Sequence, residues 1–342
     1  MDKDTTNVLL WKKSNLFSSV QRKSIMKIGF IGLGNVGGKL AGSLLRNNVE
    51  LYVRDLNADL VKKFTNMGAK TCIDNRTLME KCDAVITCLP SPAASASVME
   101  DKDGLLEGMK PGKIWMEMST TDQNEVVRIG KLISAKSGFA VDCPVSGGCH
   151  RADTGNIAIF AGCERKIFET ILPLLKKMGR RILHTGELGS ASVLKVVTNY
   201  LATANLVSCA EALVTCKAAG MDLSTSYEAI KISSGNSFVH ETESQVILNG
   251  SRDISFTMDL VAKDIGLFQN IAERHNVPLE ISPLLNTIFE DGIKKYGTRE
   301  WSPNIIRRLE DATGLNVLAE GFPSEMTDNE AEEAGYEVIP KS

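Results

Sequence analysis

Lysine and asparagine stand four positions apart in Lys195-Val196-Val197-Thr198-Asn199, within a stretch otherwise rich in alanine, leucine and valine. On a helix, residues at this spacing share one face, so the Lys195 ammonium and the Asn199 amide could both contact one substrate hydroxyl. A lysine is costly to bury in an apolar helix, and desolvation lowers its pKa readily, which suits an acid–base group. The pair therefore predicts a proton-transfer site. The alternative is that Lys195 extends from the helix edge into solvent.

A second group of residues has the composition of an anion site. The segment from Asp142 to Gly148 reads Asp-Cys-Pro-Val-Ser-Gly-Gly. Ser146 supplies a hydroxyl donor, and Gly147 and Gly148 leave backbone N–H groups uncovered, an arrangement that suits a carboxylate. The alternative is an ordinary turn between a strand and a loop.

A cationic pair, His150 and Arg151, directly follows this segment. The planar fork of donors on arginine binds carboxylate, sulfonate or phosphate, so Arg151 could contact a second anionic group of a substrate. The alternative is that Arg151 pairs with Asp153, or with an acidic residue of a neighbouring subunit, and only positions the loop.

A dinucleotide-binding pattern lies near the start of the chain. An apolar strand from Lys27 enters the turn Gly32-Leu33-Gly34-Asn35-Val36-Gly37, and a helical pattern follows. In this pattern the first glycine makes the tight turn, the second lets backbone approach a pyrophosphate, and the third lets helix and strand pack closely. The helix N-terminus then offers N–H groups and partial positive charge to phosphates.

An acidic residue, Asp55, ends the second strand about 20 residues after the glycines, where it would accept hydrogen bonds from the adenosine ribose. Its charge would repel a 2′-phosphate, so the sequence predicts NAD as the cofactor, with NADP less favoured. The alternative is that Asp55 only caps a turn.

The composition is that of a soluble globular protein. The 342 residues are 43% hydrophobic and 24% charged, and the net charge of −3 does not favour nucleic acid. We expect no membrane partner, because no apolar stretch approaches the ~20 residues that a span needs. The eight cysteines are scattered, without Cys-x-x-Cys or metal-like pairing with the four histidines, which predicts reduced thiols, a cytoplasmic location and no metal.

The periodicity of the chain predicts an α/β Rossmann-like N-terminal domain and an all-α C-terminal domain, joined by one long helix. Up to about residue 188, short apolar strands alternate with amphipathic helices, as in βαβ units on a parallel sheet. Residues 190–219 contain neither proline nor glycine, and further helical patterns follow. Strands are expected at 27–31, 50–54, 83–88, 113–118, 139–142, 156–160 and 181–184, and helices at 35–46, 190–219, 224–232, 257–274, 282–295 and 303–312.

These patterns divide the chain into four parts. Residues 1–25 form an N-terminal extension, which we interpret as loosely docked or disordered, with an organelle import peptide as the alternative. Residues 26–188 form the dinucleotide-binding domain, and residues 189–319 form the helical domain. Residues 320–342 are acidic, interrupted by two prolines and without periodicity, which predicts an irregular tail lying along a neighbouring surface.

A last segment indicates a function only in combination with the other motifs. It reads Phe256-Thr257-Met258-Asp259-Leu260-Val261-Ala262-Lys263-Asp264. Taken alone, it would be read as carrying an i,i+4 surface ion pair between Asp259 and Lys263.

Taken in order, these motifs resemble those of the β-hydroxyacid dehydrogenase family, whose best-known member is 3-hydroxyisobutyrate dehydrogenase. The resemblance runs from about residue 26 to about residue 314. It implies a Rossmann-like domain, a helical domain, a homodimer or homotetramer, and oxidation of a short 3-hydroxy acid by NAD or NADP without a metal. The matching pieces are 32–37, Cys88-Leu89-Pro90, Met118-Ser119-Thr120, 142–148, Gly155-Asn156, 195–199 and Lys263-Asp264.

The resemblance also implies roles by position. Lys195 is similar to the catalytic lysine and Asn199 to the residue that orients substrate, while Ser146, Gly147 and Gly148 are similar to the carboxylate cradle. Cofactor contacts are implied for Gly32, Leu33, Gly34, Asn35, Val36, Gly37, Asp55, Leu89, Pro90, Thr120, Phe256 and Lys263.

The chain departs from the family pattern at Glu117, where relatives often have aspartate, and at His150 and Arg151. Three rival interpretations remain. The first is a nucleotide-binding protein that has lost catalysis, which would be expected to lack the lysine. The second is a 6-phosphogluconate dehydrogenase relative, in which a histidine would replace Thr198. The third is an imine reductase, in which the lysine would be replaced. The favoured interpretation is an NAD-dependent enzyme that interconverts a small 3-hydroxy acid and its semialdehyde.

Overall fold

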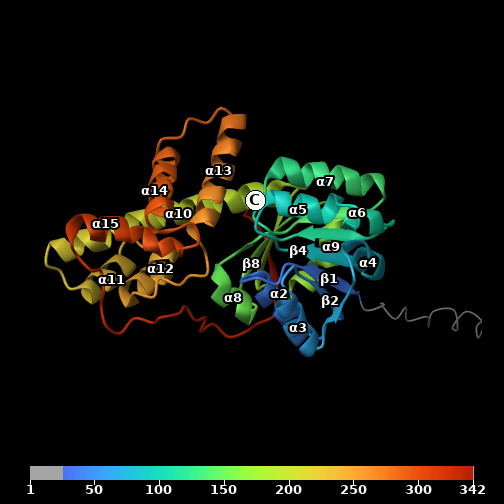
Figure 1. Cartoon of the computed structure of the whole chain (residues 1–342), viewed down its shortest axis with the longest axis horizontal. Coiled ribbons are helices and arrows are strands. Elements are labelled where there is room, and N and C mark those ends of the chain that lie inside the picture. The colour runs from blue at the N-terminus through green and yellow to red at the C-terminus, as the bar shows by residue number, and fades with distance from the viewer. Residues whose placement is uncertain (1–25, 342) are drawn as a thin grey trace, which may run out of the picture.

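The computed structural model describes residues 26–341, so the predicted extension 1–25 lies outside the described residues. A layered α/β body and a helical body lie side by side, and the long helix α10 (Ser190–Ala218) runs from one into the other (Figure 1). The predicted fold class is therefore confirmed.

The sheet orders its strands β10-β9-β8-β6-β5-β4-β1-β2-β3, with β7 paired to β8. Strands β1 and β4 are buried along their whole length, as expected of central strands covered by helices on both faces. The strands are β1 (Ile28–Ile31), β2 (Leu51–Arg54), β3 (Lys70–Thr71), β4 (Ala84–Thr87), β5 (Ile114–Glu117), β6 (Phe139–Asp142), β7 (Val145–Ser146), β8 (Ala158–Gly162), β9 (Arg181–Gly186) and β10 (Tyr336–Val338).

The expectation of a parallel sheet holds from β1 to β6 and is wrong at the next pairing, because β8 runs antiparallel to β6. A parallel return needs a crossover of a dozen or more residues, usually through a helix on the sheet face. The chain between β6 and β8 instead forms β7, which pairs antiparallel with β8, and the seven-residue helix α8 (Gly148–Thr154). Strands β8, β9 and β10 are parallel to one another.

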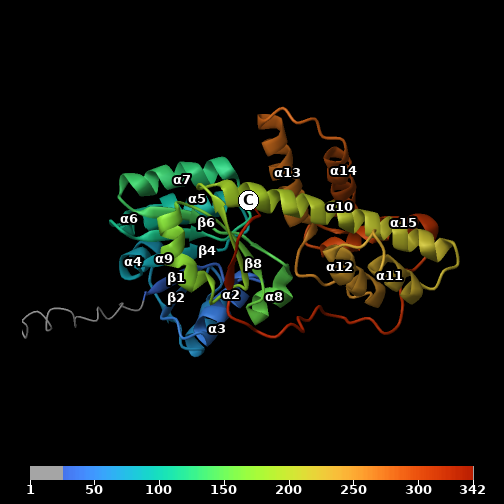
Figure 2. The same cartoon turned by 180° about the vertical axis from the view of Figure 1, so that it is seen from behind.

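Helices cover both faces of this sheet (Figures 1 and 2). The helices of this domain are α2 (Gly37–Arg46), α3 (Ala58–Asn66), α4 (Asn75–Lys81), α5 (Pro92–Glu100), α6 (Leu105–Gly108), α7 (Gln123–Ala135), α8 and α9 (Arg165–Leu175).

The helical body packs around α10, whose Leu206, Ala210 and Leu213 belong to its buried core. The predicted helices are present, and the span 303–312 is divided between a 3₁₀ turn and an α-helix. One helix, α12, was not predicted. The remaining elements are α11 (Leu223–Lys231), α12 (Phe238–Asn249), α13 (Met258–Arg274), α14 (Ile281–Tyr296), η1 (Ser302–Ile306) and α15 (Arg307–Thr313).

Helix α12 lacks a clear apolar stripe, which explains why periodicity did not indicate it. Its ends nevertheless carry ordinary signals: Ser237 accepts a hydrogen bond from the His240 N–H, and Gly250 takes the left-handed conformation that ends many helices.

Among the described residues, α10 is the one helix long and apolar enough to cross a membrane by length and composition, so the expectation that no stretch approaches that length is wrong. The same composition is found in core helices of globular proteins. In this structure α10 packs against β8 of the sheet and against α12 and α13 of the helical body.

The C-terminal segment leaves α15 and returns to the sheet domain, where Tyr336–Val338 pairs with β9 as β10 (Figures 1 and 2). The prediction of an irregular tail is therefore wrong at these residues. Without β10, the outer edge of β9 would present unpaired backbone groups, and a short segment containing tyrosine and valine suits that edge.

Candidate active site

The glycine-rich turn has the geometry that a dinucleotide needs. A side chain on Gly32, which has φ of +96°, would lie 2.2 Å from the carbonyl oxygen of Cys88, and one on Gly37 would lie 2.0 Å from the carbonyl oxygen of Gly32. Both positions must therefore be glycine because other backbone approaches so closely. No atom lies within 4 Å of the corresponding point on Gly34. Its bare backbone faces open space, which fits the approach of a pyrophosphate at the start of α2.

The carboxylate of Asp55 ties the end of β2 to this turn. Its two oxygens accept hydrogen bonds from the N–H groups of Leu33, at 2.6 Å, and Asn57, at 2.8 Å. The bond from Asn57 is the turn cap considered from the sequence. The bond from Leu33 also connects Asp55 to the glycine-rich turn. Leu56, the next residue, is fully exposed.

The turn also reaches the helical body, because the Asn35 side-chain amide donates to the carbonyl oxygen of Ser255 at 3.3 Å. Ser255 precedes α13, so the nucleotide site lies where the two bodies meet. Phe256, a predicted cofactor contact, packs against the helical core.

A polar network holds the loop after β4. The Leu89 N–H donates to the Ser119 hydroxyl at 2.7 Å, and both the N–H and the hydroxyl of Ser119 donate to one oxygen of the Glu117 carboxyl group. Burial raises the pKa of Glu117, and hydrogen bonds from neighbouring hydroxyls partly oppose this shift. Glu117, to which the sequence analysis gave no role, thus positions the segment that begins with Leu89 and Pro90.

Lys263 connects the two bodies at the same edge. Its Nζ donates to the carbonyl oxygen of Thr120 at 2.8 Å and lies 2.8 Å from Oδ1 of Asp264. Asp259 pairs with Arg299 instead, so the simple surface pair between Asp259 and Lys263 is wrong.

A third residue, Asp264, is hydrogen-bonded to the predicted acid–base pair of Lys195 and Asn199. Lys195 Nζ donates to Oδ1 of Asn199 at 2.7 Å, and Nδ2 of Asn199 donates to Oδ2 of Asp264 at 2.5 Å. Lys195 and Asp264 are both buried. The chain of contacts therefore runs from α10 to α13 and holds the ammonium group in one place.

The electrostatic environment of Lys195 suits proton transfer near neutral pH. Burial lowers the pKa of Lys195 to about 8, a shift that the nearby Asp264 carboxylate opposes and the Lys263 ammonium reinforces. An acid–base group works best when its pKa lies close to the working pH. The alternative that Lys195 extends from the helix edge into solvent is wrong, because its side chain is buried.

A buried carboxylate at the end of β6 fixes the start of α10. The two oxygens of Asp142 accept hydrogen bonds from the N–H of Gly189, at 2.8 Å, and from the N–H and hydroxyl of Ser192, at 2.7 and 3.0 Å. Lys195 lies one helical turn beyond Ser192. The sequence analysis gave Asp142 no role; its place as the last residue of an apolar strand was the signal.

The expected carboxylate cradle consists of a strand end and two glycines with positive φ. Ser146 ends β7, and Gly147 and Gly148 have φ of +126° and +87°, which favour glycine. A side chain on Gly147 would lie 3.3 Å from Cδ of Arg151, and one on Gly148 would lie 2.7 Å from Cε1 of His150. Gly147 and Gly148 therefore lie directly against the side chains of Arg151 and His150.

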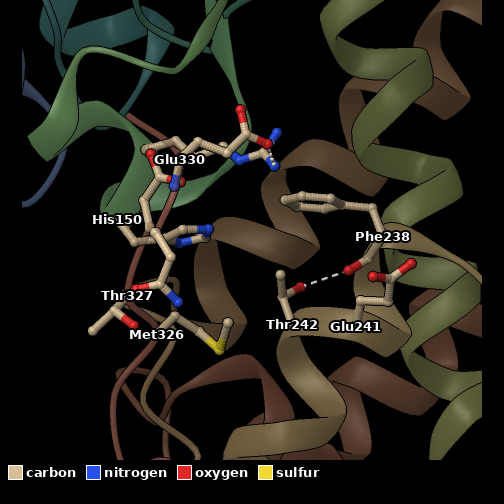
Figure 3. A pocket seen from close by; sticks show the side chains of 10 residues that line it. His150, Phe238, Glu241, Thr242, Met326, Thr327 and Glu330 are labelled. Atoms are coloured by element: carbon tan, nitrogen blue, oxygen red, sulfur yellow. Dashed lines mark hydrogen bonds and ion pairs between the residues drawn. The ribbon is translucent and has the colours of Figure 1, made fainter. Parts of the chain in front are cut away.

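A cavity of about 570 Å³ adjoins these side chains between α8, α12 and the C-terminal segment (Figure 3). The Phe238 ring faces the His150 ring, with centroids 6.4 Å apart, and the Arg151 guanidinium lies 5.0 Å from the Phe238 centroid. The lining residues are His150, Arg151, Phe238, Glu241, Thr242, Met326, Thr327, Asp328, Asn329 and Glu330.

Arg151 pairs with Glu330 of its own chain, with 3.0 Å between Nη2 and Oε1. Asp153, the partner considered from the sequence, pairs with Lys39 at 3.3 Å. Burial and the neighbouring Arg151 lower the pKa of His150, so its ring is neutral at neutral pH.

The fold and the glycine-rich turn define a two-domain, dinucleotide-binding protein. Residues 27–186 match the model of the NAD-binding domain of 6-phosphogluconate dehydrogenase, and residues 189–309 match that of the NAD-binding domain of NADP-dependent 3-hydroxyisobutyrate dehydrogenase.

Curated relatives and solved structures agree with this assignment. The chain is 35% identical to 2-(hydroxymethyl)glutarate dehydrogenase of Eubacterium barkeri, over 86% of this chain and 98% of the relative. It is 31% identical to NAD-dependent L-serine dehydrogenase of Pseudomonas aeruginosa, over 84% and 98%. The crystal structure of 3-hydroxyisobutyrate dehydrogenase from Salmonella typhimurium matches with a TM-score of 0.76 at 25% identity, over 83% of this chain and 99% of that one. The chain belongs to the β-hydroxyacid dehydrogenase family and is an NAD-dependent hydroxyacid oxidoreductase.

Proposed function

We propose that the chain interconverts a small 3-hydroxy acid and its semialdehyde, with Lys195 as the general acid–base group. The observation that carries this proposal is the buried Lys195, with a pKa of about 8, hydrogen-bonded to Asn199. A neutral lysine at this place accepts the substrate hydroxyl proton during oxidation and returns it during reduction. Bound NAD would supply the hydride acceptor.

The substrate class follows from the cradle and from the relatives. Ser146 and the backbone of Gly147 and Gly148 offer donors for one carboxylate, and Lys195 and Asn199 offer contacts for one hydroxyl. The names 2-(hydroxymethyl)glutarate, L-serine and 3-hydroxyisobutyrate each describe a hydroxymethyl group on the carbon beside a carboxylate. A 3-hydroxy acid of that form would meet both groups of donors at once.

The cofactor contacts fit the same proposal. The N-terminal end of α2 and the bare backbone at Gly34 would hold the pyrophosphate, and Asp55 would hold the adenosine ribose. Leu89, Pro90, Thr120 and Lys263 would lie near the nicotinamide end, where the two bodies meet. A cytoplasmic location and a homodimer or homotetramer are further parts of the proposal.

The test is turnover of a panel of purified 3-hydroxy acids, with NAD reduction followed by absorbance, and of the matching semialdehydes with NADH. Each panel member is compared with its 2-hydroxy isomer, which places the hydroxyl one carbon closer to the carboxylate. Preference for the 3-hydroxy form supports the proposal. Equal or better turnover of the 2-hydroxy isomers contradicts the proposed placement of the carboxylate at the cradle and of the 3-hydroxyl at Lys195.

A further inference from the structure

The C-terminal segment 315–338, called the strap below, connects the two bodies beyond the end of the family-model match at residue 309. On the helical body, the Ala319 N–H donates to the carbonyl oxygen of Leu248 at 2.9 Å, and the Asn249 side chain donates to the carbonyl oxygen of Phe322 at 2.8 Å. On the sheet domain the strap ends as β10. Both ends of the strap are therefore fixed, as its course in Figure 1 shows. Its residues 326–330 line the cavity (Figure 3).

The strap places one carboxylate among three arginines of the sheet domain. Glu330 lies 3.0 Å from Arg151, 3.1 Å from Arg180 and 3.9 Å from Arg181. Glu333 also pairs with Arg180. Glu330 therefore neutralises Arg151, while Arg180 has a second acidic partner.

Arg151 is the group that a second substrate carboxylate would meet. Its side chain is 24% exposed, its Cδ lies beside the cradle at Gly147, and its guanidinium lies over Phe238 in the cavity. A dicarboxylate held at the cradle by one end could reach this guanidinium with the other. In the structure, Glu330 already supplies a carboxylate at that position.

We propose that Glu330 is a specificity-determining residue. Its ion pair with Arg151 keeps that guanidinium from a second substrate carboxylate, so substrates with one carboxylate are selected over those with two. This inference rests on the proposed function. A tethered carboxylate acts at an effective concentration on the order of millimolar, so a free dicarboxylate must compete with it. Glu241 and Asp328, which also line the cavity, add negative charge against a second anionic group.

The experiment measures binding rather than turnover. Glutarate and valerate differ only in that glutarate has a carboxylate where valerate has a methyl group, and neither carries a hydroxyl to oxidise. Their dissociation constants are measured by calorimetry on the NAD-loaded full chain, for the wild type and for Glu330→Gln. We expect the variant to bind glutarate about three- to tenfold more tightly, because one charge-assisted pair is released, and to bind valerate unchanged.

The matched control is Glu333→Gln, which removes the same charge from the strap but leaves the pair between Arg151 and Glu330 in place. It should leave glutarate affinity within about twofold of the wild type. Adding Arg151→Ala to Glu330→Gln should abolish the gain. The proposal is overturned if glutarate affinity does not rise, if valerate affinity rises equally, or if Glu333→Gln gives the same gain.

The outcomes also separate this inference from the proposed function. Tighter glutarate binding in Glu330→Gln supports the role of Glu330 even if no 3-hydroxy acid is oxidised. Turnover of 3-hydroxy acids together with unchanged glutarate binding overturns the role of Glu330 and leaves the proposed function standing.

Discussion

The amide of Asn199 separates a buried lysine from a buried aspartate: its oxygen lies 2.7 Å from Lys195 Nζ, and its nitrogen lies 2.5 Å from a carboxylate oxygen of Asp264. Because the nitrogen donates to Asp264, the oxygen must face the lysine. Lys195 therefore meets a neutral acceptor rather than a full negative charge. This spacing leaves its pKa low while keeping its side chain in one position.

Replacing Lys195 with alanine should remove most turnover. General acid–base groups contribute about 10²–10⁴-fold, so kcat should fall by a factor in that range. NAD affinity should change little, because the lysine faces the substrate site. Steady-state kinetics and NAD titration by fluorescence measure the two effects. Near-native kcat in this variant would show that the proposed mechanism is wrong.

The pH dependence should follow the Lys195 pKa of about 8. Oxidation needs the neutral amine, so kcat/KM for the hydroxy acid should rise with pH and level off above about 8, whereas reduction of the semialdehyde should decline there. Asp264→Asn removes the carboxylate that raises this pKa, so the midpoint should move to lower pH. Asp259→Asn, on the same helix but paired with Arg299, is the control and should leave the midpoint in place.

Cofactor preference should depend on the end of β2. The wild type should have the higher kcat/KM with NAD, because the Asp55 charge repels a 2′-phosphate. The pair Asp55→Asn and Leu56→Arg should reverse the preference, since asparagine can still accept from the Leu33 N–H and arginine can bind the phosphate. Asp59→Asn, which removes a nearby charge at the start of α3, serves as the control. A wild type that prefers NADP would contradict the role given to Asp55.

Asp142 should act as a positioning residue for Lys195. Asp142→Ala leaves three buried donors of Gly189 and Ser192 without their acceptor, so the free energy of unfolding should fall by about 3 kcal/mol or more. In the folded fraction kcat should fall while KM for NAD is kept. Asp142→Asn, which keeps one acceptor oxygen, should recover part of both losses.

The control for this prediction is Asp222→Ala, which removes the N-cap of α11 outside the site. This variant should lower the free energy of unfolding by about 1 kcal/mol and leave kcat unchanged. Thermal unfolding and single-turnover rates measure the two effects. Equal effects of both variants on kcat would mean that Asp142 has no special connection with Lys195.

Local spacing in the sequence was sufficient for the features that depend on near neighbours. The glycine turn, the acid at the end of β2, the long helix and the shared face of Lys195 and Asn199 each arise within about one strand, turn or helix. Their geometry is set by fixed periods and by sterically demanded glycines, so residue type and interval predict them.

Only the tertiary structure decided which distant groups meet. Asp264 joins Asn199 across 65 positions, and Glu330 joins Arg151 across 179. The antiparallel direction of β8 and the addition of β10 to the sheet were likewise decided by the tertiary structure. Each depends on which edge strand of the sheet is unpaired where that segment meets it. A contact between distant positions leaves no interval in the sequence from which it can be inferred. Such a contact forms only when whole helices and strands pack together. The residues next to either side chain in the sequence do not indicate which distant residue it will meet.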